Sequence, residues 1–143
     1  MGQMKFEKLE VWKKALQLSS DIHDLTRSFP NEELYILTSQ IKRAADSIVL
    51  NIAEGSFGQS DREFNRFLGI ALRSGMEVIA CLHLAKTRNL INEPDFNEYR
   101  EKADHIIRMI QSFRNRLKSD SGKYGVREED EIYSTNQASG DLL

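Results

Sequence analysis

Two parallel rows of side chains between residues 34 and 55 constrain this chain more than any other feature of its sequence. The first row is apolar and repeats at steps of three and four residues, so it lies on one face of a helix and needs apolar cover. Its members are Leu34, Leu37, Ile41, Ala44, Ala45, Ile48 and Ile52. The second row is polar, has the same spacing, and lies about a third of a turn away. Its members are Gln40, Arg43, Ser47, Asn51 and Glu54.

The polar row has two interpretations, a regular solvated face or a polar seam against another helix or subunit. Serine and asparagine are poor helix-interior residues, which favours the seam. In an antiparallel hairpin that turns near residue 57, the segment 73–77 lies beside Arg43. We therefore expect a partly buried ion pair between Arg43 and Glu77, with Ser74 joining Ser47 and Asn51. Such pairs add little net stability but set the register of two helices.

Local signals divide the first half of the chain into two helices. The first is predicted over residues 7–28 and stops before Pro30, because the residue that precedes a proline disfavours the helical conformation. The second is predicted over residues 31–55. Asn31 is expected to cap its start, and Gly55 to end it in the left-handed conformation that glycine adopts without strain.

Two further helices follow, over residues 60–89 and 92–118. Ser60 and Glu63 have the spacing of a capping box, and Pro94 occupies the first turn of the last helix, where proline is tolerated. The third helix carries small residues at Ala71, Ser74 and Gly75, so another helix can approach closely there. Close packing would offset the roughly 1 kcal/mol of helix propensity that Gly75 costs.

Four helices joined by short loops predict an all-α fold, an antiparallel up-down-up-down four-helix bundle. At 143 residues the chain has the length of one domain. We assign the bundle to residues 1–118, which hold 18 Lys/Arg against 16 Asp/Glu. Residues 119–143 hold 2 against 6 and have no sustained periodicity, so they are predicted to form a disordered acidic tail.

Composition favours a soluble cytoplasmic protein. Cys81 is the only cysteine, which rules out an internal disulfide framework and fits a reducing compartment. No apolar run approaches the roughly 20 residues of a membrane span, and the N-terminus has no signal-peptide core. We therefore expect no membrane partner.

Catalytic motifs are sparse. His23, His83 and His105 lie on three different predicted helices without a motif around them, and a metal site needs three or four convergent ligands. The sequence also contains no Gly-rich phosphate loop and no nucleophile elbow. We accordingly assign no catalytic, cofactor-binding or metal-binding residues, and expect no cofactor and no enzyme activity.

One alternative is a metal-independent ribonuclease of the HEPN type. Arg100 and His105 have the Arg-x4-His spacing of such helical-bundle enzymes, in which a histidine acts as acid or base and an arginine stabilises phosphate charge. On a continuous helix, however, the two side chains point about 140° apart.

The candidate residues for contact with nucleic acid are Arg62, Arg66 and Arg73, along one edge of the third helix. The fourth helix carries Arg108, Arg114, Arg116 and Lys118. If the two edges adjoin, they form a basic strip that can hold phosphates. A solvated face is the competing interpretation, because the bundle is almost neutral and glutamates lie among the arginines.

Several motifs together resemble the four-helix-bundle family of 23S rRNA intervening-sequence proteins. They are Phe6-x2-Leu9-x2-Trp12, Phe29-Pro30-x2-Glu33, Gln40-x2-Arg43-Ala44-x2-Ser47-x3-Asn51-Ile-Ala-Glu-Gly55 and Glu63-Phe64-x2-Phe67-Leu68-x2-Ala71-x2-Ser74-x2-Glu77. The resemblance covers residues 5–118. It implies a four-helix bundle that assembles into a ring-like homopentamer. Relatives act as accessory proteins of diversity-generating retroelements and bind a reverse transcriptase, and no catalytic residues are known to carry over. Those accessory proteins are markedly basic, whereas this bundle is nearly neutral, which weakens the case for direct binding of RNA or DNA.

The sequence thus predicts a non-enzymatic, oligomeric helical-bundle scaffold. Its expected partner is a nucleic-acid enzyme such as a reverse transcriptase, or an RNA–protein complex. The alternatives are the HEPN-like ribonuclease and a purely structural oligomer.

Overall fold

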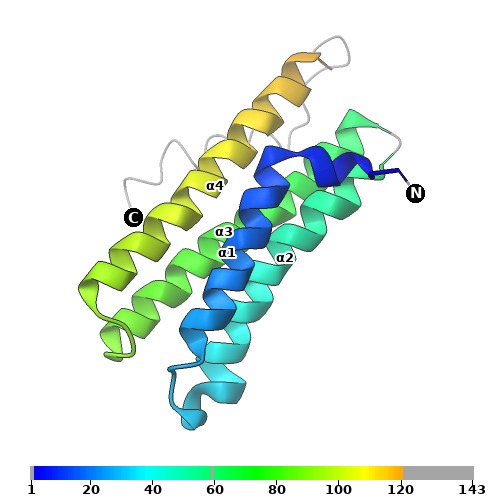
Figure 1. Ribbon diagram of the computed structural model, residues 1–143. Helices are drawn as coiled ribbons and strands as arrows, with labels where there is room; N and C mark the ends of the chain where they lie inside the picture. The colour runs from blue at the N-terminus through cyan, green and yellow to red at the C-terminus, as the bar shows by residue number, and fades with distance from the viewer. Residues whose placement is uncertain (1, 59, 121–143) are drawn as a thin grey trace.

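The computed structural model describes residues 2–58 and 60–120, and every regular element within these ranges is helical. The four α-helices are α1 (Glu10–Thr26), α2 (Ser39–Ser56), α3 (Asp61–Thr87) and α4 (Glu93–Asp120). They lie side by side, and each runs opposite to the next along the chain (Figure 1). The prediction of an all-α up-down-up-down bundle is confirmed. The predicted acidic tail lies outside the described residues from position 121 onward.

The core of the bundle is built from all four helices. The most extensive contacts join α2 to α3, and the least extensive of the neighbouring pairs is α1 with α4. The largest fully buried side chains include Leu18, Ile22, Ile41, Ile48, Ile52, Leu68, Leu72, Leu82 and Ile110. The predicted apolar row of the second helix is thereby confirmed, except at Leu34, whose side chain is 44% exposed.

The predicted first helix is interrupted at Leu9. A short 3-10 helix, η1 (Lys5–Lys8), precedes α1, and Leu9 between them has an extended backbone (φ −75°, ψ 125°). The Glu7 carboxylate accepts a hydrogen bond from the Met4 amide at 3.0 Å, which closes this separate turn. The Phe6 ring then packs against Trp12 and Phe57, at centroid distances of 4.9 and 5.5 Å. These aromatic contacts hold η1 over the end of α2 rather than in line with α1 (Figure 1).

The start of the predicted second helix is irregular. Residues Asn31–Glu33 form a 3-10 turn, η2, and Leu34–Thr38 form a π-helical turn, η3, before α2 begins. The expected Asn31 cap is wrong, because Pro30 occupies the cap position and no side chain caps η2. Glu33 takes over this role in part, since its carboxylate accepts from the Leu37 amide and is held by Arg88 of the α3 C-terminus at 3.0 Å.

The prediction for Gly55 is also wrong. Gly55 lies inside α2, which continues to Ser56, and the structure gives it no left-handed backbone. Packing explains the glycine instead. A Cβ atom at position 55 would lie 2.7 Å from Phe67 Cβ and 3.0 Å from Phe64 Cδ1, both on α3. The missing side chain allows α2 and α3 to meet closely next to their connecting turn.

The Ser60 half of the predicted capping box forms at the start of α3, whereas the Glu63 carboxylate pairs with Arg66. Pro94 lies in the first turn of α4 as predicted. Ser60 Oγ accepts from the Glu63 amide at 3.1 Å, and Asn92 Oδ1 accepts from the Asp95 amide at 2.8 Å. Asn89 ends α3 with a left-handed backbone (φ 58°). The Leu90 amide donates to the Ala85 carbonyl and the Asn89 amide to the Lys86 carbonyl, which is the Schellman pattern of helix ends.

Helix α3 makes the close approach that its small residues predict. A Cβ atom at Gly75 would lie 2.8 Å from Ile107 Cγ1 of α4. By length and composition alone, α3 is also apolar enough to cross a membrane, contrary to the expectation that no segment is. In the bundle, α3 lies between α2 and α4, and its Leu68, Leu72 and Leu82 side chains are fully buried. The apolar residues of α3 therefore form part of the core.

Candidate functional site

The polar row forms part of a seam between α2 and α3, as its side chains predict. Ser47 Oγ of α2 lies 2.8 Å from Ser74 Oγ of α3, within hydrogen-bond distance. Asn51 Nδ2 donates to the Ser47 carbonyl at 2.8 Å and to Ser47 Oγ at 3.0 Å. All three side chains are half-buried. Within one chain, therefore, the seam is a short hydrogen-bonded cluster of these three residues.

The remaining members of the row face solvent. Gln40, Arg43, Glu54 and Glu77 are exposed. The expected ion pair between Arg43 and Glu77 is absent from the described residues, because the Arg43 guanidinium turns along its own helix and donates to Ser39 Oγ at 3.1 Å. A partner four residues away on the same helix competes successfully with one across the hairpin.

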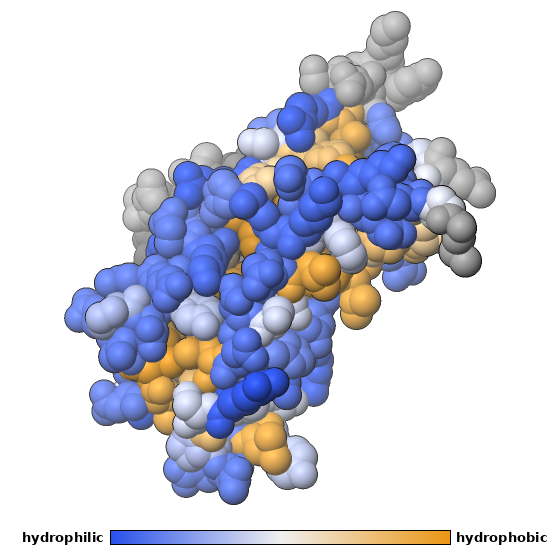
Figure 2. Space-filling model, in the orientation of Figure 1, coloured by the Kyte–Doolittle hydropathy of each residue, from blue (hydrophilic) through white to orange (hydrophobic). Residues whose placement is uncertain are grey.

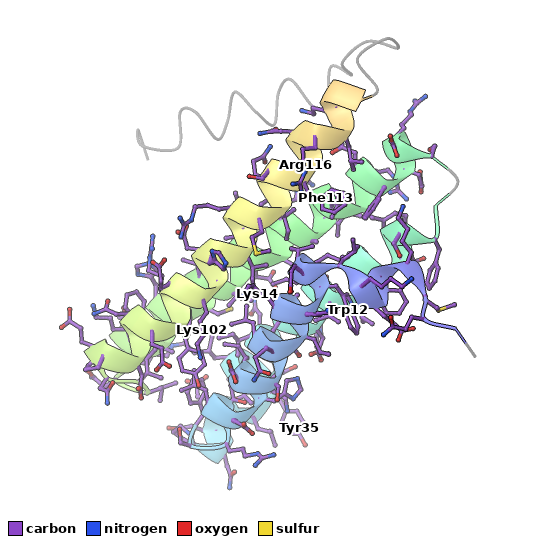
Figure 3. All side chains as sticks on the ribbon, turned by 45° about the horizontal axis from the view of Figure 1, so that its top comes forward. Trp12, Lys14, Tyr35, Lys102, Phe113 and Arg116 are labelled. Carbon is purple, nitrogen blue, oxygen red and sulfur yellow. The ribbon has the colours of Figure 1, made fainter. Side chains whose placement is uncertain are left out.

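A groove follows the outward face of α2 and brings part of the polar row together with exposed apolar side chains. We call it the α2 groove; its lining includes Leu34, Tyr35, Lys42, Arg43, Asp46, Ser47, Leu50 and Asn51. Tyr35 is 90% exposed and Leu50 is 65% exposed. Tyr35 lies at the end of the bundle where the α1–α2 connection is, as Figure 3 shows. Charges of both signs thus border an apolar strip.

One wall of the α2 groove is tied to α1 by a polar contact. The Asp46 carboxylate lies 3.1 Å from His23 Nε2 and also accepts a hydrogen bond from Ser19 Oγ. His23 and Ser19 are one turn apart on α1, so a single carboxylate spans both. The contact joins α1 to α2 at the edge of the groove.

The apolar strip was missed by sequence reasoning. Leu34 was placed in the core row, but the π-helical turn adds a residue to that turn of backbone and changes the direction of the side chains before α2 begins. Leu50 carries a usable signal, since it is a large aliphatic residue outside the predicted apolar row. An apolar residue off the periodic stripe is a candidate for an intermolecular contact.

The predicted basic edge is only partly a basic surface. Arg62, Arg66 and Arg73 are exposed on α3, but Arg66 forms an ion pair with Glu63 at 3.0 Å and stacks over the Phe67 ring. The strip expected across α3 and α4 does not form, because Arg114 is only 4% exposed. Its Nε donates to Asn65 Oδ1 at 2.9 Å, and its guanidinium lies against Gly69.

Arg100 and His105, the candidates for a HEPN-type site, both lie exposed on the continuous helix α4. His105 borders the boundary between α1 and α4, whereas Arg100 lines neither of the cavities found there. The two side chains are therefore not brought to one site within a single chain.

The other chemically versatile residues are dispersed. His83 packs its ring against Phe96 at 4.9 Å. Burial raises the pKa of the Cys81 thiol to about 11, and the negative charge of Glu77 acts in the same direction. A thiol with such a pKa is almost entirely protonated near neutral pH and is a poor nucleophile. No three His, Cys, Asp or Glu side chains converge as a metal site within residues 2–58 and 60–120.

Comparison with known proteins identifies a family and similar solved structures. Residues 7–112 match the family described as 23S rRNA-intervening sequence protein. The chain is also similar to a crystal structure of a protein of unknown function from the S23 ribosomal protein family of Bacteroides thetaiotaomicron. The two are 26% identical with a TM-score of 0.70, and the match covers 78% of this chain and 99% of the other. No curated protein matches this chain.

Proposed function

The chain belongs to the 23S rRNA-intervening sequence protein family, and on this premise we propose that it is a non-enzymatic scaffold that oligomerises through the α2 groove. In the proposed function it acts in the cytoplasm and presents the assembled bundles to a nucleic-acid enzyme, such as a reverse transcriptase, or to an RNA–protein complex. The homopentamer implied by the family resemblance is the assembly that we expect.

The observation that carries this proposal is the exposed apolar strip of the α2 groove. Leu34 and Tyr35 of η3 and Leu50 of α2 leave much of their surface in water, where it costs free energy, whereas α2 buries Ile41, Ile48, Val49 and Ile52. Figure 2 shows hydrophobic atoms protruding on the side of the molecule where α2 lies, and further hydrophobic patches elsewhere on the same face. Apolar anchors with a polar rim are the usual anatomy of a protein–protein contact.

The polar residues of the α2 groove suit such a contact. Lys42, Arg43 and Asp46 place charges of both signs within one strip, so a different surface of a neighbouring copy can offer opposite charges to them, as the heterologous contact of a closed ring requires. Ser47 and Asn51 are satisfied within the chain. They can enter an interface without leaving buried polar groups unpaired.

The first test is the mass of the assembly in solution. Light scattering on the full chain should give a defined multiple of 16.5 kDa, five being the expected number. Leu50→Glu should shift the mass toward the monomer, because a carboxylate would be desolvated in the interface, while helical circular dichroism stays unchanged. Leu84→Glu is a matched control, since Leu84 is 44% exposed on α3, outside the α2 groove.

A monomeric wild-type chain, or a Leu50→Glu variant that keeps its full mass, would exclude the α2 groove as the assembly surface. The partner is addressed separately by capture of the tagged chain from its native cell extract, with sequencing of the bound RNA and identification of the bound proteins. Recovery of the chain alone would favour the purely structural oligomer over the accessory role.

A further inference from the structure

A furrow between α1 and α4 is a second surface that the proposed function does not use. Two cavities lie end to end along this boundary, and Glu10 and His105 border both. Leu18 and Ile106 lie at one end and Met109 and Phe113 at the other, so the floor is largely apolar. The furrow is open because α1 and α4 make the least extensive contact of the neighbouring helix pairs.

The walls of this α1–α4 furrow carry more cations than anions. Its lining contains Lys8, Lys13, Lys14, Lys102, Arg108 and Arg116, but only Glu10 and Asp21 as acids. Figure 2 shows hydrophilic side chains over much of this face, with hydrophobic patches between them. In Figure 3, Lys102, Lys14, Phe113 and Arg116 follow one another along the boundary of the two helices.

Two of the six cations are already neutralised. Lys102 lies 3.1 Å from Asp21 and 3.4 Å from Glu98, and Arg108 lies 3.0 Å from both Glu101 and Asp104. Burial lowers the pKa of Lys102, but the hydrogen bonds and charges of Asp21 and Glu98 together outweigh this and raise it. Because these carboxylates already neutralise Lys102 and Arg108, we do not count the two side chains among the cations that can bind a ligand.

The other four cations have no carboxylate partner. Lys8, Lys13, Lys14 and Arg116 form no ion pair among the described residues. Lys13, Lys14 and Arg116 are exposed. They approach the furrow from both helices, and His105 and Arg116 are about 17 Å apart along α4 at 1.5 Å per residue. An elongated ligand with several negative charges matches this distribution.

An aromatic ring lies at the same end of the furrow as two of these cations. The Arg116 guanidinium lies 5.3 Å from the centroid of the half-buried Phe113 ring. Aromatic rings and guanidinium planes are the surfaces on which unpaired bases stack, and a basic groove beside them follows the phosphate backbone. Acidic polypeptides share the negative charge but gain nothing from this stacking surface.

We propose that the α1–α4 furrow binds a single strand of RNA, with phosphates on Lys8, Lys13, Lys14 and Arg116 and a base against Phe113 and Arg116. This inference takes RNA from the RNA–protein complex of the proposed function, but its surface is separate from the α2 groove. It replaces the α3 edge of Arg62, Arg66 and Arg73 as the expected RNA contact. Binding is sequence-tolerant, because the four cations contact the backbone rather than base edges.

The test is a titration of fluorescein-labelled oligouridine with the full chain, followed by anisotropy at several salt concentrations. Four phosphate contacts predict that log K falls with log [salt] with a slope of about −3, since each contact contributes about −0.7 on single strands. Lys13→Glu/Lys14→Glu and Lys8→Glu/Arg116→Glu should each weaken binding at least tenfold and make the slope shallower. Arg62→Glu/Arg66→Glu alters the net charge by the same amount and should weaken binding by less than about threefold.

Several outcomes would overturn the proposal. They are no binding of oligouridine at 50 mM salt, an equal loss in the Arg62→Glu/Arg66→Glu control, and equally effective competition by polyglutamate, which would indicate an acidic protein segment. Competition by millimolar inorganic phosphate alone would indicate a free anion instead of a strand. The mass of each variant, measured in parallel, separates a failure of the furrow from a failure of oligomerisation.

RNA integrity is followed on a gel in the same samples. Intact RNA is expected. Cleavage that disappears in His105→Ala would support the HEPN-type ribonuclease and contradict the non-enzymatic scaffold, whereas cleavage that persists in His105→Ala would exclude the Arg100/His105 site as its source.

Discussion

At the scale of a single residue, Gly55 stands where a helix-ending glycine is expected, but its role is in the packing of two helices. A glycine at the end of an apolar helix predicts a left-handed cap, but the close packing of α2 on Phe64 and Phe67 is what position 55 requires. The obstructing atom, Phe67 Cβ, is attached directly to the α3 backbone, so it cannot move without moving the helix.

We predict that Gly55→Ala destabilises the bundle by about 1–3 kcal/mol, the usual cost of overpacking. The sign is opposite to that expected from helix propensity, which favours alanine by about 1 kcal/mol. Urea unfolding measures the difference. Gly69→Ala is the control, because its added Cβ would meet only the end of the Arg114 side chain, at 3.3 Å. A stabilised Gly55→Ala variant would contradict the packing explanation.

Arg114 is a second residue whose role depends on its surroundings. An arginine in the last turns of a charged helix predicts a solvated cation, yet this one lies between α3 and α4 and donates to Asn65. Arginine can occupy such a place because its long apolar stem packs in the core and its planar head has five donors. Burial of this side chain leaves the surface near it less basic than its sequence implies.

At the scale of the element, the α1–α2 pair depends on a polar tie as well as on its apolar face. Asp46 of α2 joins Ser19 and His23 of α1 at a partly exposed position. The contact lies beside the irregular η2 and η3 turns, where regular helix hydrogen bonding is interrupted. The tie therefore fixes how α1 and α2 lie together next to the least regular part of the hairpin.

We predict that Asp46→Ala lowers the free energy of unfolding by about 1 kcal/mol, since it removes a hydrogen-bonded contact that is only half-buried. Thermal or urea unfolding provides the measurement. Asp24→Ala is the matched control on α1, because Asp24 pairs with Arg27 at 3.6 Å and both side chains are largely exposed. Its effect should stay below about 0.5 kcal/mol. Equal losses in the two variants would argue against a structural role for the Asp46 contact.

At the scale of the whole molecule, an oligomer links folding to assembly. If bundles associate through the α2 groove, the assembled state is favoured by mass action and its melting temperature depends on protein concentration. The α1–α4 furrow shares no lining residue with the α2 groove, so RNA binding and assembly are tested on separate residues.

We predict that the melting temperature of the wild-type chain rises by several degrees when its concentration is raised about a hundredfold, whereas that of Leu50→Glu does not. Differential scanning calorimetry at several concentrations measures this. Leu84→Glu should retain the concentration dependence. If the wild-type melting temperature is independent of concentration, the native chain does not gain stability from assembly.

Local sequence signals were sufficient to predict the number and order of the helices and most of their ends, the start of α2 excepted. Periodicity placed Ile41, Ile48 and Ile52 in the core, and local chemistry placed Ser60 and Asn92 at helix starts, because caps and apolar faces act between residues that are close in the chain. The small residues around Gly75 predicted a close helix contact, because small side chains let two helix backbones approach each other. The Ser47–Ser74 contact was predictable once the hairpin was assumed, since the turn near residue 57 sets its register.

Which polar and apolar residues face one another depends on the tertiary arrangement of the helices. Whether Arg114 is buried, whether Arg43 reaches Glu77, and where Lys13 and Lys14 lie relative to Arg116 all depend on how the helices are rotated against each other. That rotation is set by the combined packing of many side chains from different helices and by the irregular turns at Leu9 and Leu34–Thr38. The periodicity of a sequence predicts which residues share a face of one helix, but it does not predict which neighbouring helix that face contacts.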